Sequence, residues 1–236
     1  MKRTRGFTLI ELAIVLVLIT ILIGGLAVPL SAQIQARRIA ETRTDMRAIH
    51  DALIGYAMSH TFAHPSGVTR HFLPCPDDGS VSPGVEAIRN PVSGRCPSTR
   101  GTLPWRTLGV KGQDAWGNRY TYAVTMEFAN DMSGFVSTPT PSQGDRDIFP
   151  DAGCALPTVA ENVPAVVVSH GPNGRGAQNV SGGTPLAAAN VPADERHNLI
   201  EPSAIAPCNN SSFVSRTPTE TFDDLLIWVS PNELFS

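Results

Sequence analysis

An apolar stretch directly behind a short basic N-terminus is the feature that most restricts how this chain can fold. Residues 1–5 carry three cations, and residues 12–30 are apolar apart from Thr20, two glycines and Pro29. The segment from Phe7 to Leu30 has 24 residues, whereas roughly 20 residues of helix cross the hydrocarbon core of a bilayer. Because basic residues stay on the cytoplasmic side, we expect a transmembrane helix over Phe7–Leu30, with the rest of the chain in the periplasm.

One acidic residue, Glu11, interrupts this apolar segment four residues after Phe7. A carboxylate inside a membrane helix costs on the order of 2.5–3.5 kcal/mol on insertion scales, so we expect Glu11 to have a partner. A cut between Gly6 and Phe7 would create an amino group one helical turn away, about 6 Å along the helix axis. That cation could come from the same chain or from a neighbouring chain. The alternative is that Glu11 is a tolerated polar residue near the membrane edge.

The segment 6–11, Gly-Phe-Thr-Leu-Ile-Glu, resembles the processing site of type IV prepilins and type II secretion pseudopilins. The resemblance covers about the first thirty residues of the chain. It implies that prepilin peptidase cleaves after Gly6, that Phe7 becomes N-methylated, and that Glu11 pairs with the N-terminus of a neighbouring subunit during fibre assembly. It also implies that the partners are other pilin or pseudopilin subunits and an inner-membrane assembly platform.

An ordinary secretory signal peptide is the competing interpretation of the same segment. The residues Gly25-Leu26-Ala27 offer a small-x-small cleavage site behind a basic N-terminus. However, the apolar run is longer than the roughly 7–15 residues typical of a signal peptide, and Glu11 would interrupt it. We therefore favour the prepilin interpretation, with residues 1–6 as the leader.

Helical periodicity continues beyond Pro29, which we expect to kink the helix without ending it. The following residues contain no proline until Pro65, and apolar residues recur on one helical face: Ile39, Met46, Ile49, Leu53 and Ala57. The pattern predicts one helix from Phe7 to about Thr61. Its first half would span the membrane over residues 7–30, and its amphipathic second half, residues 31–63, would pack on a periplasmic domain.

The remainder, residues 64–236, has the size of one globular head. The full chain has 236 residues, of which 42% are hydrophobic and 17% charged. Its 20 glycines and 20 prolines predict many turns and short elements. The formal net charge is -3 and would be -6 without the leader's cations, so the sequence offers no basic surface for general nucleic-acid binding. We expect an α+β fold in which an antiparallel sheet packs on the long N-terminal helix.

The chain has four cysteines, Cys75, Cys96, Cys154 and Cys208. In a periplasmic domain an even number indicates disulfides, with three possible pairings. We expect Cys75 to pair with Cys96 and Cys154 with Cys208, because sequential pairing closes the shorter loops. The first bridge would close a loop-rich segment and remove on the order of 3 kcal/mol of unfolded-state entropy.

Residues 114–120, Asp-Ala-Trp-Gly-Asn-Arg-Tyr, resemble the Asp-Pro-Trp-Gly-x-x-Tyr signature of major pseudopilins. In that family the signature marks the turn into the first strand of the sheet. Ala115 replaces the proline here, which weakens an assignment as the major subunit. The alternation that follows predicts a half-buried strand over residues 120–126, and Trp116 is expected to anchor the core.

Two further strands are predicted from apolar runs. Residues 165–169 are β-branched and indicate a central strand. Residues 222–230 are apolar on both faces and predict a buried strand. Its first residues include Asp223 and Asp224, which we interpret as turn residues at the start of the strand rather than as a catalytic pair.

Motifs for catalysis or cofactor binding do not stand out in the sequence. The six histidines form no zinc pattern with the cysteines. Residues 77–79, Asp-Asp-Gly, lack the other ligands of a calcium loop and are read as a surface turn. Residues 170–176 are glycine-rich but fit no nucleotide-binding spacing, so we read them as a loop. We therefore expect neither an enzyme nor a bound metal or cofactor.

The sequence predicts a structural subunit, minor rather than major, of a type IV pilus or a type II secretion pseudopilus. The length and the four cysteines favour a minor subunit. Before assembly it would be a single-pass inner-membrane protein with a cytoplasmic N-terminus, and afterwards part of a fibre. The alternative is a periplasmic binding or adhesion module displayed on a pilin-type anchor, which gene deletion would distinguish by loss of ligand binding with fibres intact.

Overall fold

The computed structural model describes residues 8–136, 142–180, 191–200 and 208–235, and of residues 23–30 it describes the backbone alone. The helices are α1 (Leu9–Ser59), α2 (Trp105–Leu108), α3 (Met126–Ala129), α4 (Ala193–Arg196) and α5 (Pro231–Phe235). The strands are β1 (Thr61–Ala63), β2 (Thr69–His71), β3 (Arg100–Thr102), β4 (Thr121–Val124), β5 (Arg146–Phe149), β6 (Ala160–Val163), β7 (Ala165–Ser169), β8 (Ser212–Val214) and β9 (Leu225–Val229). A long N-terminal helix followed by mostly antiparallel strands is the expected α+β class.

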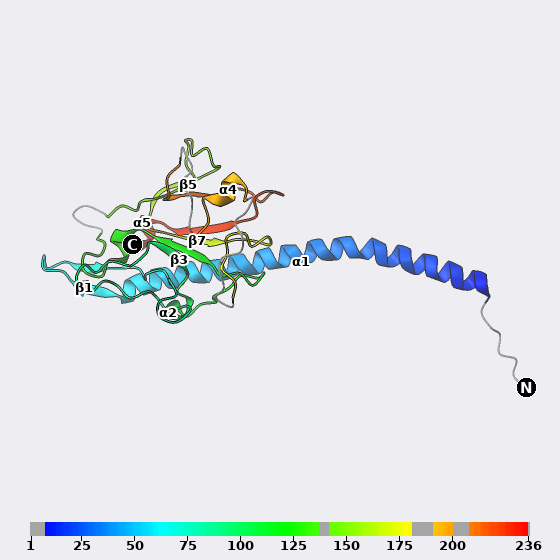
Figure 1. Cartoon of the computed structure of the whole chain (residues 1–236), viewed down its shortest axis with the longest axis horizontal. Coiled ribbons are helices and arrows are strands. Elements are labelled where there is room, and N and C mark those ends of the chain that lie inside the picture. The colour runs from blue at the N-terminus through cyan, green and yellow to red at the C-terminus, as the bar shows by residue number, and fades with distance from the viewer. Residues whose placement is uncertain (1–7, 137–141, 181–190, 201–207, 236) are drawn as a thin grey trace, which may run out of the picture. The chain divides into compact units, whose positions relative to one another are not determined.

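The chain divides into two compact units, Met1–Ala40 and Glu41–Ser236. Helix α1 contributes to both and stays helical through Pro29, as the sequence predicts (Figure 1). Within the described ranges, no helix is both long enough and apolar enough to span a bilayer. The helix ends at Ser59, slightly before the expected end, because the next residues form β1 and pair with β2 in a hairpin.

The part of α1 that belongs to the second unit buries its apolar face in the head. Met46, Ile49, Leu53 and Ala57 of the predicted stripe are between 0 and 2% exposed. Polar contacts at both ends of this part add to the packing. Lys111 Nζ lies 3.2 Å from Glu41 and 3.0 Å from Asp45, and further along His71 Nδ1 lies 2.9 Å from the carbonyl oxygen of Ala57.

The sheet next to α1 has the strand order β3-β4-β7-β9, and all of its neighbouring pairs are antiparallel. A second sheet with the order β6-β5-β8 forms another layer (Figure 1). In it β5 pairs with β6 antiparallel but with β8 parallel, which the expectation of a purely antiparallel sheet did not include. A cluster of buried side chains joins the two sheets: Ala123, Ile148, Val163, Val166, Val168 and Phe213.

Strand β7 is central and fully buried, as predicted. Strand β4 was expected to be half-buried, but it is buried on both faces because it lies between β3 and β7 in the middle layer. The prediction was also wrong for β9, which is the edge strand of its sheet, so that Leu226, Ile227 and Trp228 remain partly exposed. Trp116 is likewise only partly buried rather than a core anchor.

Candidate functional site

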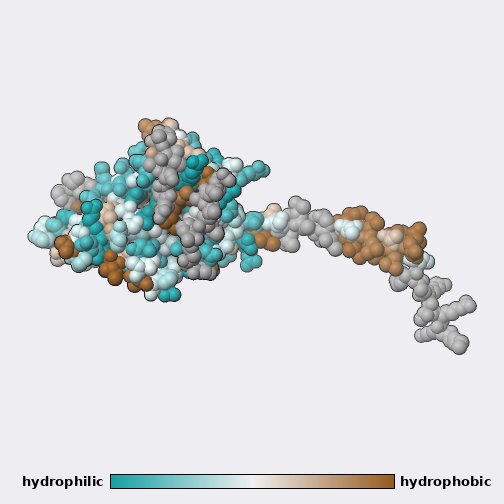
Figure 2. Space-filling view, viewed as in Figure 1, coloured by the Kyte–Doolittle hydropathy of each residue, from teal (hydrophilic) through white to brown (hydrophobic). Residues whose placement is uncertain are grey.

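The N-terminal part of α1 carries a continuous apolar surface. Its large apolar side chains between Leu9 and Leu22 are 44–88% exposed. Figure 2 shows them as a hydrophobic band on the helix. Soluble monomeric proteins rarely expose an apolar patch of this extent, and such patches mark contacts with lipid or with other protein chains.

Thr8 and Glu11 form a reciprocal capping arrangement at the start of this helix. The Thr8 backbone N–H donates to Glu11 Oε2 over 2.8 Å, and the Thr8 hydroxyl donates to the same oxygen over 2.8 Å. The Glu11 backbone N–H donates in turn to Thr8 Oγ1 over 3.3 Å. This is the capping box, which satisfies two of the amide groups left free at a helix start. Its signature, threonine and glutamate three residues apart, is present in the sequence, and sequence reasoning missed it because Glu11 was considered only as a partner for an amine.

Gly6 and Phe7, the expected cleavage site, lie outside the described residues. Cleavage at this bond and the pairing of Glu11 with a neighbouring amine are therefore taken up below as proposals. What the structure describes is the position of Glu11, one helical turn after the expected new N-terminus and exposed on the helix surface.

The two disulfides of the head are Cys75–Cys96 and Cys154–Cys208, the pairing expected from the sequence. In each, the Cα atoms lie 5.6 Å apart. Cys75 is fully buried and Cys96 is 5% exposed. The first bridge therefore forms part of the core and fastens the long irregular segment between β2 and β3.

Glu86 ties the same segment to α1, a role that sequence reasoning did not foresee. Its Oε1 accepts a hydrogen bond of 2.8 Å from the Tyr56 hydroxyl. Its Oε2 lies 2.9 Å from Arg89 Nη1 and accepts a hydrogen bond of 3.1 Å from the Cys75 backbone N–H. A carboxylate that joins a helix, an arginine and a disulfide stabilises the fold and is not available as a reactive group.

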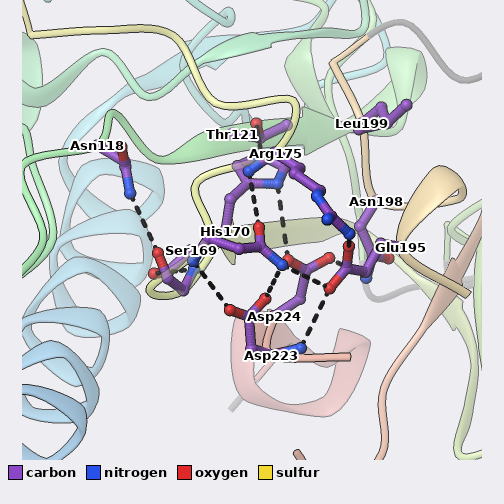
Figure 3. A network of polar contacts seen from close by, with 12 residues as sticks. Asn118, Thr121, Ser169, His170, Arg175, Glu195, Asn198, Leu199, Asp223 and Asp224 are labelled. Atoms are coloured by element: carbon purple, nitrogen blue, oxygen red, sulfur yellow. Dashed lines mark hydrogen bonds and ion pairs between the residues drawn. The ribbon is translucent and has the colours of Figure 1, made fainter. Parts of the chain in front are cut away.

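A buried polar network lies where β7 ends and β9 begins, and it includes Glu195 of α4 (Figure 3). His170 Nε2 lies 2.8 Å from Thr121 Oγ1. The other ring nitrogen, Nδ1, lies 3.8 Å from Asp224 Oδ1. Asn198 Nδ2 donates to Asp224 Oδ2 over 2.8 Å. Asp224 directly precedes β9, at the strand start where the sequence analysis placed it, and is only 2% exposed.

The buried Glu195 and the partly exposed Asp223 extend this network. Asn173 Nδ2 donates to Asp223 Oδ1 over 2.6 Å and to Glu195 Oε1 over 3.0 Å. The Asp223 backbone N–H donates to the same glutamate oxygen over 3.2 Å. Three polar atoms of the network have no hydrogen-bond partner among the described residues: Glu195 Oε2, Asp224 Oδ1 and His170 Nδ1.

Burial shifts the proton affinities in this network. It raises the pKa of Asp224 well above its ordinary value. It also raises the pKa of Asp223 to about 6, and the neighbouring Glu195 adds to that rise. For His170, burial and the nearby Arg100 cation lower the pKa to about 4. The imidazole is therefore neutral at pH 7, and the carboxyl groups retain protons to a higher pH than exposed ones.

Glu195, Asp223 and Asp224 are also the residues best placed to hold a metal, because one carboxylate oxygen of each lies within 4.8 Å of the others. Hard cations such as Ca²⁺ prefer oxygen ligands of this kind. Cys154, His197 and Cys208 lie equally close together, but the two sulfur atoms are bonded to each other and so cannot serve as thiolate ligands. The expectation of no bound metal remains a prediction.

Asp77 of the Asp-Asp-Gly turn is 5% exposed and therefore not the surface residue expected. Its Oδ2 accepts a hydrogen bond of 2.7 Å from Gly84 N–H and one of 3.1 Å from the Thr102 hydroxyl. Its Oδ1 accepts a further bond of 2.9 Å from Gly79 N–H. These contacts make Asp77 a structural carboxylate that joins the turn to β3.

Residues 1–27 match the family model described as the prokaryotic N-terminal methylation motif. The match covers the N-terminal part of the chain and supports a type IV prepilin-like protein. The motif indicates a structural pilin-like protein that is a substrate of prepilin peptidase and assembles with other pilins. No curated protein and no solved structure matches the chain.

Proposed function

We propose that this protein is a structural subunit, minor rather than major, of a type IV pilus or a type II secretion pseudopilus. The observation that carries the proposal is the methylation motif at residues 1–27, within which α1 exposes its apolar side chains from Leu9 to Leu22. An apolar helix surface of this kind can exchange lipid for the helices of other subunits, because both surroundings are apolar. The α+β head with two disulfides then forms the outer part of the subunit.

The proposed precursor is a single-pass inner-membrane protein. Residues 1–6 are the cytoplasmic leader, residues 7–30 cross the membrane and the head is periplasmic, because the three cations of the leader favour the cytoplasmic side. Residues 31–59 continue the helix, and the residues after Ser59 form the rest of the head. Prepilin peptidase removes the leader after Gly6, and Phe7 becomes the methylated N-terminus.

Glu11 is the proposed assembly contact. Its carboxylate is exposed, and within the described residues Thr8 supplies its hydrogen-bond donors. Thr8 uses only Oε2, so among the described residues Oε1 has no donor and can accept from the Phe7 amine of a neighbouring subunit. In an apolar fibre core such a pair neutralises two charges that would each be costly alone.

The experiment compares Glu11→Ala with Glu41→Ala, which also removes an exposed α1 glutamate but lies in the head unit. Membrane content and sheared-fibre content are measured side by side by immunoblot. Glu11→Ala makes the segment more apolar, so the variant should reach the membrane and be cleaved. It should nevertheless be depleted from fibres by about tenfold or more, because an unpaired amine in the fibre core costs several kcal/mol. Glu41→Ala should assemble as the wild type does.

Two results would count against the proposal. Equal incorporation of Glu11→Ala and wild-type protein would show that Glu11 has no assembly role. Absence of the wild-type chain from every sheared-fibre preparation would remove the assignment as a fibre subunit and favour an anchored binding module.

A further inference from the structure

A groove of about 410 Å³ lies beside β9 in the unit Glu41–Ser236. Helix α1 lines it with Arg43, Met46 and Arg47, and the chain after β8 lines it with residues 215–218. Residues 224–227, at the start of β9, complete its lining. We refer to this feature as the β9 groove.

The backbone of β9 has one unpaired edge. The strand is the last in the order β3-β4-β7-β9 and pairs with β7 along its whole length, Leu225–Val229. Among the described residues, its backbone makes no backbone hydrogen bond outside that ladder. In an antiparallel strand every second residue turns its N–H and C=O away from the paired neighbour. These groups are available to a further strand.

The sequence of β9 does not protect this edge. Natural proteins commonly block edge strands with charged residues, prolines or bulges. The strand Leu225–Val229 reads Leu-Leu-Ile-Trp-Val and contains none of the charged residues or prolines. Its register with β7 runs without a shift from Ala165 to Ser169, so it has no bulge either. An edge of this kind is suited to strand addition by an extended peptide.

The charges around the groove are positive. Arg43 and Arg47 are exposed, lie one helical turn apart on α1 and form no ion pair with any described residue. Arg216 is partly exposed and pairs with Asp194 over 3.0 Å. The acidic residue that lines the groove, Asp224, is 2% exposed, and its Oδ2 already accepts a hydrogen bond from Asn198. The surface open to a ligand is therefore cationic.

The acidic residues of α1 do not offset this charge. Glu41 and Asp45 pair with Lys111. Glu41 lies two residues from Arg43 and six from Arg47, and Asp45 lies two residues from each arginine; side chains at these spacings do not face each other on a helix. Asp51 lies four residues after Arg47, but its carboxylate contacts His50 over 3.3 Å and forms no ion pair with Arg47. The two arginines therefore have cationic side chains in solvent at the border of a strand edge.

We propose that the β9 groove binds an extended acidic segment of a partner protein. The segment adds a strand to the free edge of β9, and its carboxylates meet Arg43, Arg47 and Arg216. Five residues of strand span about 16 Å, so a short peptide covers the edge. Main-chain hydrogen bonds to β9 provide affinity, and the arginines select acidic side chains. The site belongs to the head and does not require that the N-terminal helix assembles into a fibre.

The test measures binding of a fluorescein-labelled peptide of alternating glutamate and valine to the full-length chain in an uncharged detergent, by fluorescence anisotropy. The chain with Arg43→Ser and Arg47→Ser should bind it at least about tenfold more weakly, because two charge-assisted contacts are lost. The matched control is Arg37→Ser with Arg38→Ser, which removes two exposed cations from the same helix outside the groove. The control should change the affinity by less than about twofold.

Two altered peptides separate strand addition from simple charge attraction. A peptide with lysine in place of glutamate should not bind. A glutamate peptide N-methylated at alternate amides keeps its charge but cannot form the ladder, and should bind at least about tenfold more weakly. Equal binding of the methylated peptide, or equal loss in both double-arginine variants, would overturn the proposal.

Binding of other anions is the remaining outcome to distinguish. Phosphatidylglycerol vesicles or single-stranded DNA that bind in an Arg43- and Arg47-dependent manner, more tightly than the peptide, would replace an acidic protein with a lipid or nucleic-acid ligand. Absence of peptide binding to the wild-type chain would also overturn the proposal. Thermal unfolding of each variant checks that the head is still folded, as expected for exposed positions.

Discussion

Thr8 directly precedes the first residue of the long helix α1, Leu9. Its hydroxyl both donates to the Glu11 carboxylate and accepts from the Glu11 backbone, so the first turn is closed by two side chains. The same contacts fix where the Glu11 carboxylate lies on the helix. Glu11 therefore has two roles in this account, since it caps its own helix and, in the proposal, meets a neighbour's amine.

Thr8→Val should loosen the first turn of α1 without affecting the head. Loss of the capping hydroxyl costs about 1 kcal/mol of local helix stability. Hydrogen exchange of residues 9–13 in detergent micelles should accordingly become several-fold faster. Thr20→Val is the control, because the Thr20 hydroxyl bonds only to carbonyl oxygens within the helix. Equal exchange rates in Thr8→Val and wild type would show that the capping box does not form in micelles.

Asp224 gives a second prediction at this scale. A carboxyl whose pKa is higher in the folded than in the unfolded state stabilises the protein at low pH, and this contribution is lost as pH rises through the folded pKa. Asp224→Asn removes the cost of burying a charged carboxylate and keeps a side-chain oxygen that can accept the hydrogen bond from Asn198. In a buffer with EDTA it should therefore raise the free energy of unfolding by about 1 kcal/mol at pH 8, and by less as pH falls towards 5.

Urea unfolding at several pH values provides the measurement for Asp224→Asn. His170 titrates in the opposite sense, because its lowered pKa adds stability as pH rises from about 4 towards its ordinary value. The comparison is therefore made between variant and wild type at each pH, which removes the histidine contribution common to both. The contrary result is a variant that is less stable than the wild type at pH 8, together with a wild-type protein that Ca²⁺ stabilises. That result would show instead that the carboxylates hold a cation.

At the scale of elements, the segment between β2 and β3 shows how a stretch with little regular structure is ordered. It relies on the Cys75–Cys96 bridge, on Glu86 and on glycines in the left-handed region. Gly84 has φ of 86°, and a Cβ at this position would overlap the ring of Trp105. The indole therefore packs directly on the backbone of this loop.

Gly84→Ala should destabilise the head by about 3 kcal/mol, because it adds a clash with the Trp105 ring to the backbone strain of a positive φ. Gly79→Ala is the matched control. Gly79 also has a positive φ, 77°, but a Cβ there meets nothing within 4 Å, so only about 1 kcal/mol should be lost. Urea denaturation of the two variants checks this difference. Equal losses would contradict the packing of Trp105 on Gly84.

The disulfide pairing can be tested in the same region. Replacement of Cys75 and Cys96 together by alanine should lower the free energy of unfolding by about 3 kcal/mol, because the bridge closes a loop with a sequence separation of 21. Peptide mapping under non-reducing conditions should recover Cys75 linked to Cys96 and Cys154 linked to Cys208. A Cys96–Cys154 linkage would contradict both the structure and the sequence prediction.

Sequence patterns predicted the elements that depend on local periodicity. The buried stripe of α1 followed from helical spacing, and β7 followed from a β-branched run. The burial of β4 on both faces and the edge position of β9 could not be predicted in this way, because strand order is decided by contacts between distant residues. The same limit applies to Asp77 and Asp224, whose partners lie far away in the sequence.

For the whole molecule, the two units differ in the surface that they present. The described part of the first unit shows exposed apolar side chains from Leu9 to Leu22. The second unit has a buried apolar core, and Figure 2 shows its surface as largely hydrophilic with scattered hydrophobic residues. A subunit that assembles through its helix and displays its head needs an apolar helix surface and a hydrophilic head surface. The match of residues 1–27 to the methylation motif points in the same direction.

The most direct test of the account is intact-mass spectrometry of the protein recovered from sheared surface fibres or pseudopili. The account predicts a chain in that fraction that begins at N-methylated Phe7 and lacks residues 1–6. Before reduction it should be four hydrogen atoms lighter than after reduction, because it retains both disulfides. Mutation of Gly6 to valine should leave the leader attached and keep the chain in the inner membrane. Recovery of a chain that begins at Met1 or near Val28, or absence of the chain from fibres, would contradict the central claim.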